Sequence, residues 1–238
     1  MSVGFLLMDF EGVGRSGGSG PRAPFPTGAA LELMRTVWKT SRMLVLASNS
    51  AARKALLTGA GLRFEASPAQ IDERALEAEL LGKAPEQVAR ALAEAKALDV
   101  SRRRPGDTVI GGDQLLAFEG ALLHKPADFA EARAQLDRLK GRLHHLHCGI
   151  ALARDGELMW SETNSARLLM REFTDAERDK VLALEGEAVL GSVGAYRLEG
   201  PSVRLFAAIE GDYFTILGLP LLPLLTALRL HAPKTLSQ

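Results

Sequence analysis

Short apolar runs alternate with segments of helical period from Met43 onward, and this alternation leaves few folds open to the chain. The apolar run at 43–47 predicts a buried strand, and residues 50–58 predict a helix that ends just before two closely spaced glycines. A second helix is predicted over about 85–100, because its apolar residues fall on one face. Strands and helices in such alternation are typical of an α/β domain.

The rest of the chain continues this alternation. We expect a strand over 107–118, a helix over 129–139, long β segments over 143–154 and 157–171, a helix over 175–184, an irregular extended segment over 196–209 and a helix over 219–230. No internal repeat and no linker follow residue 43. One continuous domain over 43–238 is therefore the expected organisation.

The N-terminal segment has a different composition. Seven of the 23 glycines and three of the 11 prolines fall within residues 1–28, where no sustained apolar period occurs. We expect residues 1–42 to be a disordered or non-native extension of the domain. Its one apolar run, 5–8, is too short for a signal peptide and has no basic residue before it, so export is not expected.

The charge balance limits the partners of the chain. The 29 basic and 29 acidic residues give a net charge of zero, which argues against a nucleic-acid polymer or an anionic membrane as partner. The single cysteine, Cys148, excludes an internal disulfide and fits a reducing compartment. No apolar stretch approaches the roughly 20 residues that span a bilayer. We therefore expect a cytoplasmic protein.

Two hydroxyls and two cations occur where the first strand leads into the first helix. These are Ser48, Ser50, Arg53 and Lys54. The N-terminus of a helix attracts phosphate through its free N–H groups and its dipole, and arginine can bind phosphate oxygens with two hydrogen bonds. The segment thus predicts a phosphate site. The alternative is that Ser50 only caps the helix and both cations are solvated.

Two carboxylates are candidates for metal binding or proton transfer. Asp113 follows Val-Ile-Gly-Gly near the end of a predicted strand, and Glu73 lies in a predicted loop at 70–73. Together they could hold a divalent cation that bridges phosphate oxygens and prepares a water for attack. The alternative is that Asp113 ends the strand and Glu73 faces solvent.

Two lysines, Lys96 and Lys125, are further candidates for binding an anionic substrate, although lysine is usually a surface residue. A histidine-rich run at 144–148 suggests a metal site at first sight. On a strand, however, His145 and His147 would share one face and His144 the other, and no second cysteine is available for a zinc site. We therefore interpret this run as ordinary strand packing.

Taken in order, these pieces resemble the Maf family of nucleoside triphosphate pyrophosphatases over residues 43 to about 232. The matching motifs are Ser48-Asn49-Ser50-Ala51-Ala52-Arg53, Asp72-Glu73, Ala95-Lys96-Ala97, Gly111-Gly112-Asp113-Gln114, His124-Lys125-Pro126, Val193-Gly194-Ala195-Tyr196-Arg197-Leu198-Glu199-Gly200, Glu210-Gly211-Asp212-Tyr213 and Gly218-Leu219-Pro220. Ala52, Ala95 and His124 depart from the family's pattern. The departures bear on phosphate affinity more than on catalysis, because the other residues of each motif are present.

The resemblance implies a single elongated α/β domain with a central mixed sheet, a nucleotide cleft between two lobes, and a homodimer. It also implies a requirement for Mg²⁺ or Mn²⁺ and cleavage of a nucleotide between its α- and β-phosphates. On this interpretation Glu73 and Asp113 bind metal or orient the water, and Asp113 is the candidate base. Ser48, Arg53, Lys96 and Lys125 would hold the triphosphate.

Gln114 and Glu199 are the candidates for recognising the base, and the branch that resembles this chain in carrying them acts on 7-methyl-GTP. A carboxylate only accepts hydrogen bonds, and guanine offers two adjacent donors on its Watson–Crick edge. The alternatives are a pyrophosphatase for dTTP or UTP and a nucleotide-binding regulator of cell division without catalysis. Glu199 could also simply face solvent.

Overall fold

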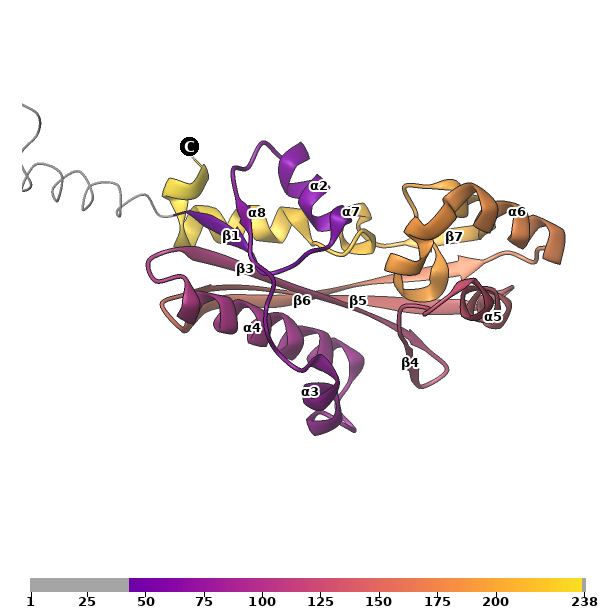
Figure 1. The fold of residues 1–238 in the computed structure, drawn as a ribbon, viewed down its shortest axis with the longest axis horizontal. Helices are drawn as coiled ribbons and strands as arrows, with labels where there is room; N and C mark the ends of the chain where they lie inside the picture. The colour runs from indigo at the N-terminus through magenta and orange to yellow at the C-terminus, as the bar shows by residue number, and fades with distance from the viewer. Residues whose placement is uncertain (1–42, 237–238) are drawn as a thin grey trace, which may run out of the picture. The chain divides into compact units, whose positions relative to one another are not determined.

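A mixed sheet of seven strands forms the centre of the fold (Figure 1). The computed structural model describes residues 43–236, and the extension predicted at 1–42 lies outside the described residues. The strands are β1 (Leu44–Leu46), β2 (Glu65–Ala66), β3 (Thr108–Phe118), β4 (Ala121–Leu123), β5 (Leu143–Arg154), β6 (Glu157–Met170) and β7 (Phe206–Glu210). Their order is β2-β1-β3-β5-β6-β7, and β4 pairs with β3. β1 pairs in parallel with β2 and with β3, and the other pairs are antiparallel, so the predicted α/β class and mixed sheet are confirmed.

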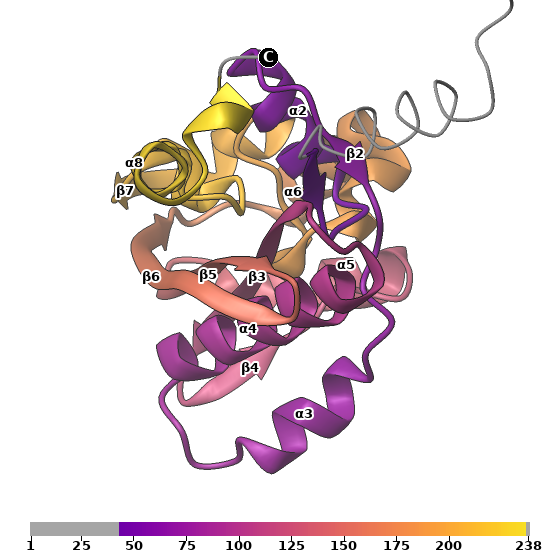
Figure 2. The same cartoon turned by 90° about the vertical axis from the view of Figure 1, so that its left-hand side faces the viewer.

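Helices cover both faces of this sheet. The α-helices of residues 43–236 are α2 (Ala51–Gly59), α3 (Glu73–Glu79), α4 (Pro85–Arg103), α5 (Phe129–Leu139), α6 (Asp175–Glu185), α7 (Tyr213–Ile216) and α8 (Leu221–His231). Figures 1 and 2 show α4 along one face and α2 and α8 along the other. Successive side chains of a strand point to opposite faces of the sheet, so both faces carry apolar residues that a helix can cover. Val109 packs with α4, whereas Ile110 packs with α2 and α8. None of the helices in the described part has the length and apolar character that crossing a membrane requires.

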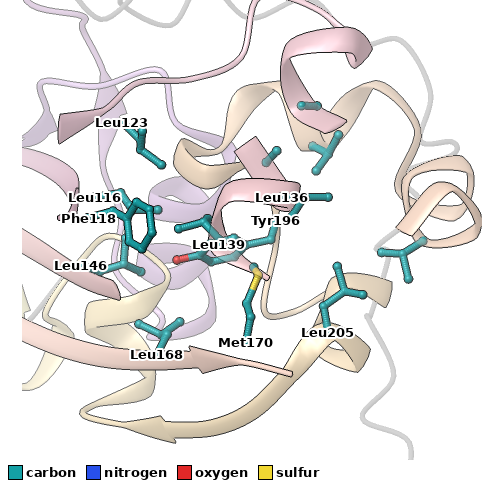
Figure 3. Packing of buried hydrophobic residues seen from close by; sticks show 14 of the residues in the cluster. Leu116, Phe118, Leu123, Leu136, Leu139, Leu146, Leu168, Met170, Tyr196 and Leu205 are labelled. Atoms are coloured by element: carbon teal, nitrogen blue, oxygen red, sulfur yellow. The ribbon is translucent and has the colours of Figure 1, made fainter. Parts of the chain in front are cut away.

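Two apolar cores lie at opposite ends of the long strands. The α2–α8 core joins β1 and those two helices to Ile110, Ile150 and Leu152. The α5–α6 core, drawn in Figure 3, joins those helices to the far end of β3 and to the segment around Tyr196. The two cores account for two lobes on one sheet. The cleft between them stays a prediction.

Short elements are where the structure differs from the sequence-based expectation. The sequence predicts a loop at Glu73, but Glu73 is the first residue of α3, where Asp72 caps the helix by accepting a hydrogen bond from the N–H of Ala75 at 3.0 Å. The segment 196–209, expected to be irregular, contains the 3₁₀ helix η3 (Pro201–Leu205) and most of β7. Elements of so few residues contain too little apolar sequence to show a period.

Candidate active site

One edge of β3 is open in its middle. β1 pairs with β3 only up to Ile110, and β4 pairs with it only from Leu116 onward. Within the described residues no strand covers the edge between these points, so side chains from either face of the sheet can reach it. Asp113 and Gln114 lie in this interval, and the loop after β1, which contains Ser48, begins beside it.

Asp113 points to the face that α4 covers. The ammonium nitrogen of Lys96, on α4, donates a hydrogen bond to Oδ1 of Asp113 at 2.6 Å, and each of the two side chains is only 9% exposed. The same nitrogen lies 2.9 Å from Oε2 of Glu73, whose side chain is half exposed. Both predicted carboxylates therefore meet at one buried cation, which a capping or solvent-facing role does not explain.

Arg53 occupies the opposite face of the same strand. Its Nε donates to the carbonyl of Gly218 at 2.7 Å and its Nη1 donates to Oγ of Ser48 at 3.0 Å. Ser50 does cap α2, since its Oγ accepts a hydrogen bond from the backbone N–H of Arg53. The guanidinium is nevertheless buried, so the alternative of a solvated Arg53 is wrong.

Lys125, in the connection from β4 to α5, completes a group of charges around the open edge. Partial desolvation lowers its pKa, and the charges of Arg53 and Lys96 lower it further. The negative charges of Glu73 and Asp113 raise the pKa of Lys125. These influences place Lys125 within electrostatic reach of the other four charged candidates, which gives a group of three cations and two carboxylates.

The two candidates for base recognition are held by protein groups. The amide nitrogen of Gln114 donates to the carbonyls of Thr215 and Ile216 in α7, at 3.1 and 2.9 Å, which leaves its oxygen for a ligand. Glu199 accepts a hydrogen bond from Nε of Arg197 at 3.1 Å, and its side chain is 31% exposed. Among residues 43–236 no hydrogen bond or ion pair joins Glu199 to the charged group at the open edge.

Gly112 and Gly218 make room for Arg53, and the sequence did not indicate this contact. A Cβ at Gly112 would lie 3.2 Å from Nε of Arg53, and Gly218 has a φ of +90° and presents the carbonyl that Arg53 binds. Gly112 belongs to the Val-Ile-Gly-Gly run singled out in the sequence, and glycine in a strand often marks a close approach of another group. That this group is Arg53 could not be predicted, and neither could the contact with Gly218, which lies 165 residues from Arg53.

The histidine run packs as expected. The rings of His145 and His147 stack 6.0 Å apart on one face, and His144 hydrogen bonds with the hydroxyl of Tyr196 on the other. In the part of the chain that the structure describes, no three His, Cys, Asp or Glu side chains gather into one group that could hold a metal ion. Two carboxylates beside three cations suit a ligand that brings its own oxygens, and a polyphosphate is such a ligand.

Comparison with known proteins agrees with this chemistry. Residues 43–231 match the family described as "Maf-like protein". The chain is 52% identical over 194 residues to a nucleoside triphosphate pyrophosphatase of Rhodopseudomonas palustris (strain BisB18), covering 82% of this chain and 96% of that protein. It is 50% identical over 188 residues to the 7-methyl-GTP pyrophosphatase of Brucella abortus biovar 1 (strain 9-941), covering 78% and 94%. The 7-methyl-GTP pyrophosphatase of Mesorhizobium japonicum (strain LMG 29417 / CECT 9101 / MAFF 303099) is 52% identical over 188 residues, covering 78% of this chain and 94% of that protein. The chain belongs to the Maf family.

Proposed function

We propose that this protein hydrolyses a nucleoside triphosphate to the monophosphate and pyrophosphate, with 7-methyl-GTP as its preferred substrate. The observation that carries the proposal is the meeting of Asp113 and Glu73 at the Lys96 ammonium group, next to Arg53 and Lys125 on the open edge of β3. The names of the relatives point in the same direction. We assign the activity to the domain predicted over 43–238.

The cations are the proposed triphosphate site. Transfer of a phosphoryl group requires little covalent chemistry from a protein, so catalysis depends on positioning and on neutralising charge. Arg53 is held by Ser48 and by the carbonyl of Gly218, and a fixed guanidinium loses little freedom on binding phosphate. Lys96 and Lys125 provide the remaining positive charge.

Asp113 and Glu73 are the proposed ligands of a divalent cation, Mg²⁺ or Mn²⁺. Their donor chemistry fits, because Mg²⁺ is commonly bound by one or two carboxylates together with substrate phosphates and waters. Such a cation, when bound, would neutralise charge on the phosphates and acidify a water.

Asp113 is the proposed general base. One of its carboxylate oxygens accepts a proton from the attacking water, whose oxygen then bonds to the α-phosphorus. The bond from that phosphorus to the oxygen bridging it to the β-phosphorus breaks, and pyrophosphate leaves. The Lys96 hydrogen bond at 2.6 Å fixes the carboxylate for this step.

Glu199 is the proposed reader of the base, with the oxygen of Gln114 as a second contact. The carboxylate accepts hydrogen bonds from N1–H and the 2-amino group of guanine, which uracil and thymine cannot both supply. Methylation at N7 makes the base cationic and adds charge assistance. The homodimer and the cytoplasmic location stay predictions.

Hydrolysis in ¹⁸O-labelled water tests the site of attack. With Mg²⁺ and 7-methyl-GTP, we expect the label in the nucleoside monophosphate and none in pyrophosphate, as ³¹P NMR would resolve. Label in pyrophosphate would place the attack at the β-phosphorus, and release of inorganic phosphate alone would show a phosphatase.

A further inference from the structure

Glu185 is a buried carboxylate that the proposed mechanism does not use. It is the last residue of α6, and its side chain is fully enclosed, with 0% exposed. A negative charge at the C-terminal end of a helix is disfavoured by the helix dipole, and burial removes the carboxylate from water. The partners of Glu185 must therefore account for its position.

Those partners belong to one short segment, residues 197–202. Oε1 of Glu185 accepts hydrogen bonds from the backbone N–H of Ser202 at 2.8 Å and from its hydroxyl at 2.7 Å. Oε2 accepts a hydrogen bond from Nη1 of Arg197 at 3.4 Å. The two oxygens of one carboxylate thus hold both ends of the segment.

Gly200 lies between these two ends, and any larger residue there would have to displace the Glu185 carboxylate. A Cβ at this position would fall 2.5 Å from Oε1 and 2.8 Å from Oε2 of Glu185. The N–H of Gly200 also donates to the carbonyl of Arg197 at 3.2 Å, which closes a turn. The segment therefore folds directly around the Glu185 carboxylate.

Arg197 connects this buried anchor to Glu199. Its Nη1 binds Glu185, and its Nε donates to Oε1 of Glu199 at 3.1 Å. The side chains of Arg197 and Glu199 are about equally exposed, at 32% and 31%, whereas Glu185 is enclosed. One guanidinium thus joins a fixed carboxylate to an accessible one and leaves Oε2 of Glu199 without a hydrogen bond among the described residues.

We propose that Glu185 is a positioning residue that determines base specificity by fixing Arg197 and, through it, the accessible carboxylate of Glu199. This inference rests on the proposed function, in which Glu199 reads the guanine edge. Charge-assisted hydrogen bonds depend on geometry, so a Glu199 that rotates freely would discriminate less between a base with two adjacent donors and a base with one.

The first test is Glu185→Gln, which keeps the shape of the side chain. The amide oxygen can still accept the Ser202 hydrogen bonds, but the amide nitrogen cannot accept one from Arg197. We expect kcat/KM for 7-methyl-GTP, relative to that for UTP, to fall about tenfold, as loss of a well-oriented charged hydrogen bond would give. KM for 7-methyl-GTP should rise while kcat stays within about twofold, because the phosphate chemistry is left in place.

A double-mutant cycle with Glu199→Gln separates positioning from general structural support. If Glu185 acts through Glu199, Glu185→Gln should not change the 7-methyl-GTP to UTP ratio further once Glu199 is replaced. Arg178→Gln is the matched control, since Arg178 is another buried charged residue of α6 whose partners, Asp137, Asp175 and Asp179, lie outside the segment 197–202. It should lower stability and leave the ratio unchanged.

Two results would overturn the inference. One is an unchanged ratio in Glu185→Gln, and the other is an equal further loss in the Glu199→Gln background. Failure of the proposed function would show differently, because the wild-type protein would then release no pyrophosphate from any nucleotide.

Discussion

The ammonium nitrogen of Lys96 lies 2.6 Å from Oδ1 of Asp113, although the two residues come from different elements, α4 and β3. Both side chains are 9% exposed, so the pair is shielded from solvent. The ammonium group also reaches Glu73, and it is therefore the centre of the carboxylate cluster. The proposed chemistry depends on this cluster.

Asp113→Asn tests the cluster directly. The change is nearly isosteric but removes the proton acceptor, so turnover should fall at least about 100-fold, the scale of general-base loss. The fold should survive, as circular dichroism would show. Asp107→Asn is a suitable control, because Asp107 immediately precedes β3 and accepts hydrogen bonds from Arg104 and from the N–H of Met43. Wild-type turnover in Asp113→Asn would mean that Asp113 is not catalytic.

Gly111 and Gly112 should respond differently to the same substitution. A Cβ at Gly111 would fall 2.0 Å from the carbonyl oxygen of Ala93, so Gly111→Ala forces α4 away from the sheet. We expect a loss of about 3 kcal/mol or more in the free energy of unfolding. The nearest atoms to a Cβ at Gly112 all belong to the side chain of Arg53, the first at 3.2 Å.

Gly112→Ala should therefore cost less stability than Gly111→Ala and raise KM for the triphosphate about tenfold, since the side chain of Arg53 must shift by a few tenths of an ångström. Urea unfolding and steady-state kinetics on both variants check this contrast. Equal loss of stability in the two variants would contradict the assignment of Gly112 to Arg53.

Gln114→Glu tests the attachment of α7 to β3. The new carboxylate keeps an acceptor oxygen but cannot donate to the carbonyls of Thr215 and Ile216. We expect the free energy of unfolding to fall by about 1–3 kcal/mol, as for polar groups that lose their partner. Chemical denaturation at neutral pH measures the change. A fully stable variant would show that these two hydrogen bonds do not hold α7.

His144 should make stability depend on pH. Burial lowers its pKa to about 4, against an ordinary value of 6.5. Between these values the unfolded chain binds a proton that the folded protein does not, so stability falls as the pH drops through this window. The contribution of His144 from about pH 7 to about pH 5 is a loss of roughly 2 kcal/mol.

The comparison that isolates His144 is urea unfolding of the wild type and of His144→Gln, each at about pH 7 and at about pH 5. The variant loses a ring packed beside Tyr196 and Phe206 and is expected to be less stable overall, but its stability should change less with pH. His147, whose pKa is also lowered by desolvation, is present in both proteins and cancels. An identical pH dependence in the two proteins would rule out the neutral, buried state of His144.

The long elements and the charged candidates were predictable because local patterns specify them. The alternation in β5 placed His145 and His147 on one face, and Lys96 stood at the edge of an apolar stripe. The partners of these residues were not predictable, because pairs such as Arg53 with Gly218, or Gln114 with α7, are more than 100 residues apart in sequence. The role of Glu185 likewise depends on tertiary packing, since the sequence presents it as one more acidic residue on an amphipathic helix.

The most direct test of the central claim is pyrophosphate release by the wild-type protein with Mg²⁺ and equal concentrations of 7-methyl-GTP, GTP, UTP and dTTP, each supplied separately. We expect pyrophosphate from 7-methyl-GTP at the highest kcat/KM, and Glu199→Gln should reduce that preference. Preferred turnover of UTP or dTTP would contradict base recognition by Glu199, and release of no pyrophosphate from any of the four would contradict the proposed activity itself.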